Sequence, residues 1–423
     1  MQIELAYGRS GLTVDLPDTV QVITSRPVPG VPDEGAALRA ALRQPVGTSP
    51  LAALVKRGDR VVVAHTDITR ATPNRRMLPV LLDELQEAGV APEDITLLNA
   101  LGTHRPQTDT ELREMLGEGI VDRYRCFQHS AFDDAGLVAL GHTRAGHPVR
   151  VNRRFLEADV RILTGFIEPH FFAGFSGGPK GVLPALAGAE SVATNHGYAM
   201  IGHPSATWGV TDGNPIWEEM KEVALRTQSS FLLNVTMNAC REITGVFAGD
   251  MLAAHARGCA FVREQSMVPV KAPFDIVVTT NSGYPLDQNL YQSVKGMSAA
   301  ARIVRDGGAI VMAAACADGL PDHGCYAGLL REGGSPQGLL DLVARPGFSR
   351  QDQWQVQIQA MIQKRAEVHV YSEGLTADQI RQALFTPCVD LAATVGRLQQ
   401  RFGPGARIAV VPDGPLTMAY VQR

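Results

Sequence analysis

Between Pro169 and Gly197 the chain carries two histidines, a glycine-rich loop and a lysine, in the letters P-H-F-F-A-G-F-S-G-G-P-K-G-V-L-P-A-L-A-G and, further on, N-H-G. Glycine and serine let a backbone approach a bound group closely. A lysine amine can bond covalently to a carbonyl-type carbon once its charge is suppressed. A neutral imidazole is the commonest protein ligand for a transition metal. This combination predicts an attached metallo-cofactor rather than a simple substrate cleft.

The glycine-rich loop at 173–180 invites comparison with a phosphate-binding P-loop, but it does not match one. Pro179 stands between Gly178 and Lys180 and removes a backbone donor where phosphate binding needs one. No Ser or Thr follows the lysine to hold magnesium. The alternative interpretation is an ordinary glycine-rich turn with a solvated lysine. His196 is a single histidine and not a metal site by itself, so further ligands would have to come from a bound group.

Apolar runs suited to buried strands alternate with helical patterns along the chain. This alternation predicts an α/β fold with two domains and largely parallel sheets. Residues 1–17 alternate apolar and polar side chains around two glycines and are expected to form a hairpin. Thr108 and Glu111 have the spacing of a helix capping box. The expected buried strands are Arg60–Ala64, Ile95–Ala100, Val160–Gly165, Asp275–Thr280, Ala309–Ala315 and Ile408–Val411.

Polar clusters follow four of these strands, at the point where each strand ends. In open α/β sheets, ligands bind beyond the carboxyl ends of the strands. Four clusters in that position therefore predict one active site, in a cleft between the two domains. The clusters read H-T-D-I-T-R after Ala64, G-T-H-R-P after Ala100, E-P-H-F-F-A-G after Gly165, and G-Y-P-L-D-Q-N-L-Y-Q-S-V-K after Thr280.

Each cluster also has an ordinary structural interpretation. Asp67 and Thr69 could cap a helix, but an arginine at a strand end is better explained if Arg70 holds an anionic group through its fork of donors. His104 and His170, taken singly, are typical loop histidines. Their positions at two successive strand ends favour proton transfer, because imidazole ordinarily titrates near neutral pH.

The fourth cluster supplies donors on one helical segment. The spacing places Tyr291 and Lys295 on the same face of a helix, with Gln292 beside them. Exposed helices often carry such residues, which is the structural alternative. After a strand end, we interpret the three as donors to a substrate carboxylate or hydroxyl.

The bulk composition is that of a water-soluble enzyme. The chain has 423 residues, 45% of them hydrophobic, and a net charge of −4, which gives no sign of nucleic-acid binding. The amino terminus lacks the pattern of a signal peptide, and the longest apolar run, Ala309–Cys316, is too short to span a membrane. Six scattered cysteines predict reduced, mostly buried thiols and a cytoplasmic protein.

The expected domains are 1–270, which would carry the cofactor attachment and catalysis, and 271–423. The boundary is set at residues 267–273 because two prolines there separate a helical pattern from a strand. The last expected strand, near 407–412, could pack on either domain, and packing on the first domain is kept as an alternative. A homo-oligomer is neither required nor excluded.

Five motifs together resemble the nickel-dependent lactate racemase family, whose members racemise or epimerise 2-hydroxy acids. The resemblance runs from about Ala64 to Met297. Two positions depart from the commonest family form: Ala185 stands where glycine is usual, and Pro179 replaces a basic residue before the lysine. Both leave the chemistry in place but alter the loop. The motifs are D-I-T-R from Asp67, G-T-H-R-P from Gly102, P-H-F-F-A-G-F-S-G-G-P-K from Pro169, N-H from Asn195, and Y-Q-S-V-K from Tyr291.

The resemblance implies a role for each cluster. The family cofactor is nickel held by pyridinium-3-thioamide-5-thiocarboxylic acid mononucleotide, the nickel-pincer nucleotide, which separate biosynthetic enzymes make. By that resemblance Lys180 tethers the cofactor as a thioamide, His196 is a nickel ligand, and His104 and His170 are the acid–base pair. Residues near the cofactor or its phosphate would be Asp67, Arg70, Ser176, Gly177 and Gly178, and residues holding the substrate would be Arg70, Tyr291, Gln292 and Lys295.

Physical chemistry supports the implied reaction. Removing a proton from C2 of a hydroxy acid is unfavourable because the neighbouring carboxylate is already negative, whereas loss of a hydride gives a flat 2-oxo acid. Racemisation then needs two proton carriers, one for each face. Two alternatives stay open: a sugar-acid epimerase with the same cofactor, and a non-catalytic protein that only binds the cofactor.

Overall fold

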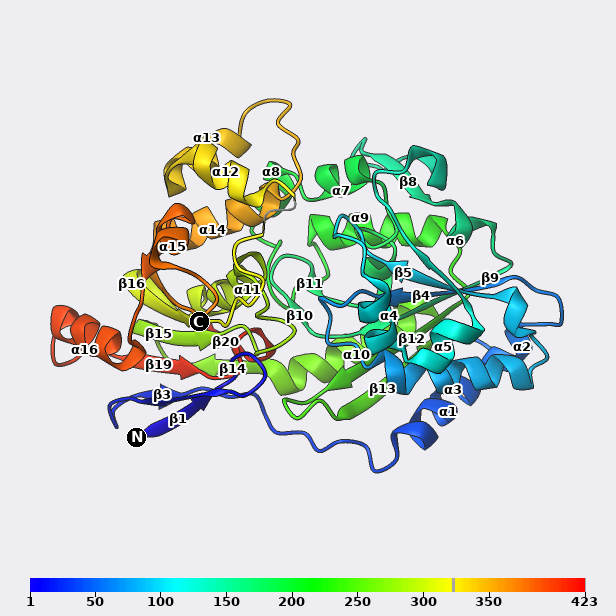
Figure 1. Cartoon of the computed structure of the whole chain (residues 1–423), viewed down its shortest axis with the longest axis horizontal. Coiled ribbons are helices and arrows are strands. Elements are labelled where there is room, and N and C mark those ends of the chain that lie inside the picture. The colour runs from blue at the N-terminus through cyan, green and yellow to red at the C-terminus, as the bar shows by residue number, and fades with distance from the viewer. Residues whose placement is uncertain (322–323, 423) are drawn as a thin grey trace. The chain divides into compact units, whose positions relative to one another are not determined.

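The computed structural model describes residues 1–321 and 324–422, which form two compact units (Figure 1). The N-terminal unit comprises Pro27–His196 and His203–Arg263. The C-terminal unit comprises Met1–Arg26, Gly197–Gly202 and Glu264–Arg423. The boundary expected at 270/271 lies close to the last of these divisions. The first 26 residues, which the sequence placed in the N-terminal domain, instead group with the C-terminal unit.

The N-terminal unit is built on a six-stranded sheet in the order β13-β12-β9-β4-β5-β6. All neighbouring strands run parallel except the edge pair β12 and β13. The central strands are continuous apolar runs, as expected of a sheet that is covered on both faces. The three strands expected in this region are confirmed within one or two residues. The strands are β4 Val61–Thr66, β5 Ile95–Ala100, β6 Arg125–Gln128, β9 Val160–Phe166, β12 Phe231–Met237 and β13 Ile243–Gly249.

Two helices cover one face of this sheet. The helix α1 (Glu34–Arg43) and the helix α3 (Asn74–Glu87) bury Leu38, Leu42, Met77 and Leu81 against alternate sheet residues such as Val63 and Ile162. Figure 1 draws the helix α9 (Pro215–Arg226) on the other side of these strands. The unit also contains the helices α2 Leu51–Leu54, α4 Asp109–Leu116, α5 Glu118–Arg123, α6 Arg153–Glu157, α7 Ala189–Asn195 and most of α10 Met251–Ser266. Two short antiparallel strand pairs complete it: β7 Leu137–His142 with β8 Pro148–Asn152, and β10 Pro169–His170 with β11 Gly174–Phe175.

The C-terminal unit has a second six-stranded sheet, in the order β18-β17-β16-β15-β19-β3, with every neighbouring pair parallel. The α/β prediction with largely parallel sheets is therefore confirmed for both units. The expected last strand, β19, lies between β15 and β3. The strands are β3 Gln21–Val22, β15 Phe274–Thr280, β16 Val304–Ala313, β17 Ala366–Tyr371, β18 Thr386–Pro387 and β19 Ile408–Val411.

The expected amino-terminal hairpin is present as β1 (Gln2–Leu5) and β2 (Leu12–Asp15). Its apolar face, including Ile3, Leu5 and Val14, packs with the helix α16 (Leu391–Phe402) on one face of the C-terminal sheet. The helix α11 (Leu290–Ala301) contacts β15 and β16. The other helices are α8 Tyr198–Ile201, α12 Tyr326–Gly333, α13 Pro336–Val343, α14 Gln353–Arg365 and α15 Ala377–Gln382.

The stretch at 267–273, where the domain boundary was expected, begins with a strand. The strand β14 (Met267–Val270) pairs in parallel with β20 (Met418–Val421). Pro269 is tolerated there because the two strands form a sheet of their own, in which each strand has a free edge. The six cysteines are free thiols, three of them buried and one, Cys240, exposed. None of the described helices is long and apolar enough to cross a membrane.

Candidate active site

Three of the four polar clusters lie at one edge of the N-terminal sheet. The strands β4, β5 and β9 are parallel, and β4 pairs with the other two. Their carboxyl ends, at Thr66, Ala100 and Phe166, therefore point the same way. The clusters that contain Asp67, His104 and His170 follow directly. The fourth cluster follows β15 in the C-terminal unit, and its membership of the same site stays a prediction.

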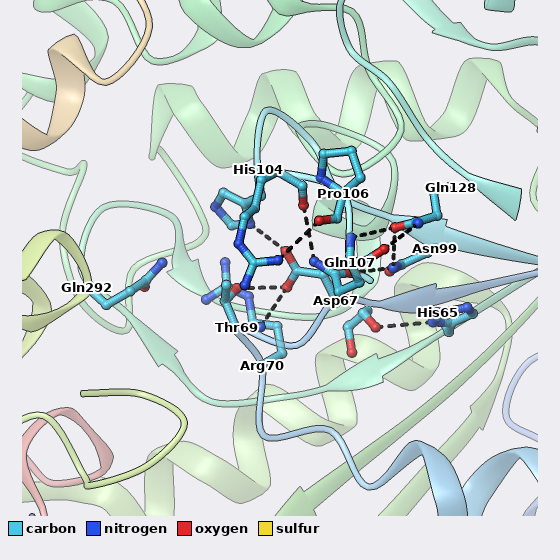
Figure 2. Close-up of polar contacts among 12 residues, drawn as sticks. His65, Asp67, Thr69, Arg70, Asn99, His104, Pro106, Gln107, Gln128 and Gln292 are labelled. Atoms are coloured by element: carbon cyan, nitrogen blue, oxygen red, sulfur yellow. Dashed lines mark hydrogen bonds and ion pairs between the residues drawn. The ribbon is translucent and has the colours of Figure 1, made fainter. Parts of the chain in front are cut away.

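The carboxylate of Asp67 holds His104 by one ring nitrogen (Figure 2). Its Oδ2 lies 2.5 Å from Nδ1 of His104, and its Oδ1 accepts from the hydroxyl of Thr69 at 2.7 Å. Asp67 is 3% exposed. Burial alone would raise its pKa, but the nearby His104, Arg70 and Thr69 outweigh burial and lower the pKa to about 2. The carboxylate is thus a fixed negative acceptor that binds His104 through Nδ1.

A buried amide cluster fixes the loop that presents His104. The side chain of Gln128 accepts from the backbone N–H of Gln107 and donates to its carbonyl, both at 2.8 Å. The fully buried Asn99 donates to the Gln107 side chain. Figure 2 shows these three amides next to the Asp67–His104 pair. Because the loop leaves β5 and its far end, at Gln107, is bonded to Asn99 of β5 and Gln128 of β6, His104 has a defined position although its side chain is 30% exposed.

Three further residues of the predicted site lie around the ring of Phe172. His170 packs edge-on against it at 4.5 Å between ring centroids, and His196 does so at 4.9 Å. The Nζ atom of Lys180 lies 5.4 Å from the centre of the same ring. Lys180 is 8% exposed and His196 is 3% exposed. Burial, and the positive charge of Lys180, hold the pKa of His196 well below its usual range. His196 is therefore neutral, which is the form that binds a metal.

His170 is oriented by its own turn. Its Nδ1 atom accepts from the backbone N–H of Ala173 at 3.3 Å, within the turn between β10 and β11. An acceptor at Nδ1 places the proton of the neutral ring on Nε2. The turn joins β10 to β11, which pair antiparallel over two residues each.

A buried carboxylate fixes the end of the helix on which His196 stands. His196 is the C-cap of α7, directly after Asn195. The Nδ2 atom of Asn195 donates to Oε2 of Glu219 at 2.8 Å. The other oxygen of Glu219 accepts from Thr143 at 2.7 Å and from His147 at 2.8 Å. These contacts tie α7 to α9 and to the β7–β8 hairpin.

The end of β4 and the segment after it hold buried polar atoms that have no hydrogen-bond partner among the described residues. The Nη1 atom of Arg70 lies 3.9 Å from the carboxylate of Glu168 but makes no hydrogen bond within the described residues. The hydroxyls of Thr66 and Thr72 also have no hydrogen-bond partner there. Buried polar groups are normally satisfied, so this segment is suited to a polar or anionic ligand.

The loop residues Ser176, Gly177 and Gly178 have close protein neighbours. The Ser176 hydroxyl donates to the carbonyl of Phe166 at 2.7 Å and accepts from the N–H of Glu168 at 3.0 Å. The loop that follows reaches the His104 segment, since the carbonyl of Ala185 accepts from the N–H of Gly102 at 2.9 Å. A cofactor contact by the three loop residues stays a prediction.

Tyr291, Gln292 and Lys295 all lie on α11, as the sequence predicted. The Nζ atom of Lys295 donates to the Gln292 side chain at 2.6 Å, and the Tyr291 hydroxyl accepts from the indole N–H of Trp354 at 2.9 Å. Asn289 caps the helix by accepting from the N–H of Gln292 at 3.0 Å. This geometry fixes the three side chains within the C-terminal unit.

Among the described residues, no group of three or more His, Cys, Asp or Glu side chains is arranged to hold a metal ion. A metal at His196 would thus need ligands from a bound group. No pattern in the sequence indicated that Asp67 orients His104, or that Glu168, Phe172, Gln107 and Glu219 contact the predicted residues. The spacing of Asp67 and His104 carries no signal, because parallel strand pairing alone brings them together.

Two family models match the chain. The model of the lactate racemase N-terminal domain matches residues 7–209, and that of the lactate racemase C-terminal domain matches residues 270–418. Together they account for more than half of the chain. Lactate racemases are isomerases.

Individual relatives agree with the family models. The chain is 36% identical over 418 residues to a lactate racemase of Thermoanaerobacterium thermosaccharolyticum, with 97% of each chain covered. It is 37% identical over 383 residues to a lactate racemase of Lactiplantibacillus plantarum, with 90% of each covered. The apoprotein structure of a lactate racemase from T. thermosaccharolyticum superposes over the whole chain with a TM-score of 0.91 at 35% identity. This chain therefore belongs to the lactate racemase family.

Proposed function

We propose that this protein racemises a short 2-hydroxy acid of the lactate type, using a nickel-pincer nucleotide attached to Lys180. One observation carries the proposal: His170, Lys180 and His196 surround the Phe172 ring at the sheet edge where Asp67 orients His104. A cofactor-binding protein without a reaction would have no need of an oriented histidine beside an attachment site.

The donor chemistry at this edge suits the cofactor that the family resemblance implies. His196 is a buried, neutral imidazole, and borderline metals such as nickel accept imidazole ligands. Lys180 is buried beside it, as an attachment residue would be. Arg70 keeps a buried donor without a hydrogen-bond partner in the described residues, which fits an anionic phosphate or carboxylate. When bound, the nickel-pincer nucleotide would supply a reversible acceptor for the hydride on C2 of the substrate.

The two histidines would act as general acid and general base at the substrate hydroxyl. The Nε2 atom of His104 would take the hydroxyl proton on one face, while Asp67 stabilises the imidazolium that forms. The Nε2 atom of His170 would do the same on the other face. Two acid–base groups are needed because the planar 2-oxo acid must be re-protonated at oxygen from the side opposite to the first transfer.

The remaining residues would hold the substrate and the cofactor. Arg70 would bind the cofactor or the substrate carboxylate. Tyr291, Gln292 and Lys295 would supply further donors to the substrate from α11. Asp67, Ser176, Gly177 and Gly178 are proposed to lie near the cofactor, as the resemblance implies.

An isotope experiment tests the reaction. Protein produced together with the cofactor-making enzymes is given L-lactate carrying deuterium at C2, and chiral chromatography with mass spectrometry follows the D-lactate formed. We expect interconversion without added NAD and retention of deuterium at C2, because a transferred hydride does not exchange with water. Full loss of deuterium would instead indicate proton abstraction from C2. No interconversion of lactate, malate, 2-hydroxyglutarate or aldonic acids would refute the racemase and the epimerase alike.

A second experiment tests the attachment and the metal ligand. We expect the intact mass of the wild-type protein to include the cofactor, and Lys180→Ala to lack that mass. His196→Ala should lose most of its nickel, measured by elemental analysis after gel filtration. His104→Gln is the matched control and should keep both the adduct and the nickel while losing turnover. Loss of nickel in both histidine variants would contradict the separate roles assigned here.

A further inference from the structure

The turn before Lys180 has two successive residues with positive φ angles. It follows β11 and consists of Ser176, Gly177, Gly178 and Pro179 before the lysine. Gly177 has a φ angle of +75° and Gly178 has a φ angle of +52°, in the left-handed region that favours glycine. The carbonyl of Gly177 accepts from the N–H of Lys180 at 3.1 Å, which closes the turn.

Asn234, on β12, supports this turn from the protein interior. Asn234 is 1% exposed, and its Oδ1 atom accepts from the N–H of Gly178 at 2.9 Å. Its Nδ2 atom donates to the carbonyl of Leu233 at 3.0 Å. A Cβ atom placed on Gly177 would lie 2.5 Å from Oδ1 of Asn234. The amide therefore occupies the space that any other side chain at position 177 would need.

His255, on α10, supports the same turn through a second contact. It is 1% exposed, and its Nε2 atom donates to the carbonyl of Ser176 at 2.9 Å. A Cβ atom on Gly178 would lie 2.5–2.9 Å from three atoms of its ring. Burial lowers the pKa of His255 to about 4, so the ring is neutral near pH 7 and has a single N–H to donate.

These two contacts explain why positions 177 and 178 are both glycine. A side chain at either position would collide with Asn234 or with His255, which belong to two different elements. The Ser176 hydroxyl is bonded to Phe166 and Glu168. The conformation of the turn is thus set by its buried neighbours before any ligand binds.

We propose that Asn234 and His255 are positioning residues that fix the 176–180 turn and thereby aim the amine of Lys180 for attachment of the cofactor. This inference rests on the proposed function. In the attachment, the amine forms a C–N bond to a thiocarboxylic acid carbon to give a thioamide. The C–O bond of that carbon breaks, and its oxygen leaves as water with one proton from the neutral amine and one from the thiocarboxylic acid. The thioamide nitrogen keeps one N–H, and no electrons are gained or lost. Such a condensation is sensitive to small errors in the position of the nucleophile.

The test compares four variants with the wild-type protein. Asn234→Ala removes the acceptor for the Gly178 N–H, and His255→Leu removes the donor to the Ser176 carbonyl. His255→Gln keeps a side-chain N–H donor of similar reach. Thr236→Ala is the matched control: Thr236 is buried on the same strand as Asn234, and its hydroxyl bonds to Thr244 at 2.9 Å without contacting the turn.

Two measurements are made on each variant. Hydrogen–deuterium exchange of the apoprotein, read by mass spectrometry on peptides covering 174–182, reports the turn without any cofactor. Intact mass after co-production with the cofactor-making enzymes reports attachment, and thermal unfolding monitors the fold. For Asn234→Ala and His255→Leu we expect faster exchange of the turn and about tenfold slower attachment, the effect of losing one buried hydrogen bond. His255→Gln should restore both, and Thr236→Ala should lower only the unfolding temperature.

The outcomes separate this inference from the proposed function. If wild-type protein gains no adduct, the proposed attachment at Lys180 is wrong, and the exchange data alone decide whether the two residues set the turn. If wild-type protein gains the adduct and Asn234→Ala and His255→Leu gain it equally fast, the positioning role is refuted. Should Asn234→Ala fail to fold, the comparison of His255→Leu with His255→Gln decides. Equal loss of attachment in Thr236→Ala would mean that only general stability matters, which also overturns the inference.

Discussion

The acid–base role that we propose for His104 depends on which of its ring nitrogens can exchange a proton. Asp67 binds Nδ1 and is itself held ionised, with a pKa of about 2 because His104, Arg70 and Thr69 outweigh the effect of burial. The imidazole is thereby fixed in one orientation and one tautomer, and its positive form is stabilised as the proton arrives. We therefore assign the acid–base role proposed here to the pair rather than to the histidine alone.

Asp67→Asn tests the pair. We expect kcat to fall by about 10²–10⁴-fold, the usual contribution of a positioned acid–base group, while the covalent adduct and the nickel content stay unchanged. Steady-state kinetics and intact mass measure the two effects. Asp59→Asn is the control, because Asp59 is also buried and accepts from the backbone N–H of Lys56, away from His104. Loss of the adduct in Asp67→Asn would show that Asp67 serves mainly to bind the cofactor.

Among the helices, α7 shows how a short element is made rigid enough to carry a ligand. It has only seven residues, too few to be stable alone, and its last turn ends on His196. Glu219 supplies the missing rigidity by accepting hydrogen bonds from Asn195, Thr143 and His147. A helix tied at its end to two other elements can hold an imidazole at a fixed point.

Glu219→Ala tests this arrangement. The buried donors of Asn195 and Thr143 and the half-buried ring of His147 would lose their acceptor. We therefore expect the apoprotein to be destabilised by about 2–4 kcal/mol in urea unfolding. Nickel retention should fall as well, because α7 would no longer hold His196 in place. Glu222→Ala, on the same helix but half-buried and paired with Arg226, is the comparison and should keep its nickel. Nickel retention equal to wild type in Glu219→Ala would contradict the role.

For the molecule as a whole, buried neutral histidines predict the response to acid. Burial lowers the pKa values of His65, His129 and His255 to about 4. In the unfolded chain each would bind a proton below about pH 6.5. Between pH 6.5 and 4 the unfolded state therefore binds more protons, and stability falls as the pH falls. The stability gained by keeping these histidines neutral is fully present above about pH 6.5 and is lost as the pH approaches 4.

When the pH falls from 7.5 to 5, we expect the free energy of unfolding of the apoprotein to fall by roughly 2 kcal/mol for each of these three histidines. Urea unfolding at several pH values measures this loss. His129→Gln should flatten the pH dependence, whereas replacing the exposed His142 by Gln should leave it as it is. A stability that stays constant from pH 7.5 to 5 would show that these histidines are not kept neutral in the fold.

The amino-acid sequence by itself determined the local structure and the identity of the reactive groups. Continuous apolar runs specified strands such as Ile95–Ala100, and Thr108 with Glu111 specified a capping box that is present. The order of the clusters placed Asp67, His104 and His170 after strand ends, and the family resemblance identified the enzyme class. These features depend on residues that are close in the sequence, so that a sequence pattern can predict them.

Only the tertiary structure decided which distant groups meet. The Asp67 carboxylate meets His104 because β4 and β5 pair in parallel, and Glu219 meets Asn195 because α7 and α9 pack together. The glycine pair at 177 and 178 is explained by Asn234 and His255, which lie far along the chain. The first 26 residues join the C-terminal unit because the apolar face of their hairpin is buried on that sheet. Such contacts follow from the packing of surfaces, and no local pattern in the chain encodes them.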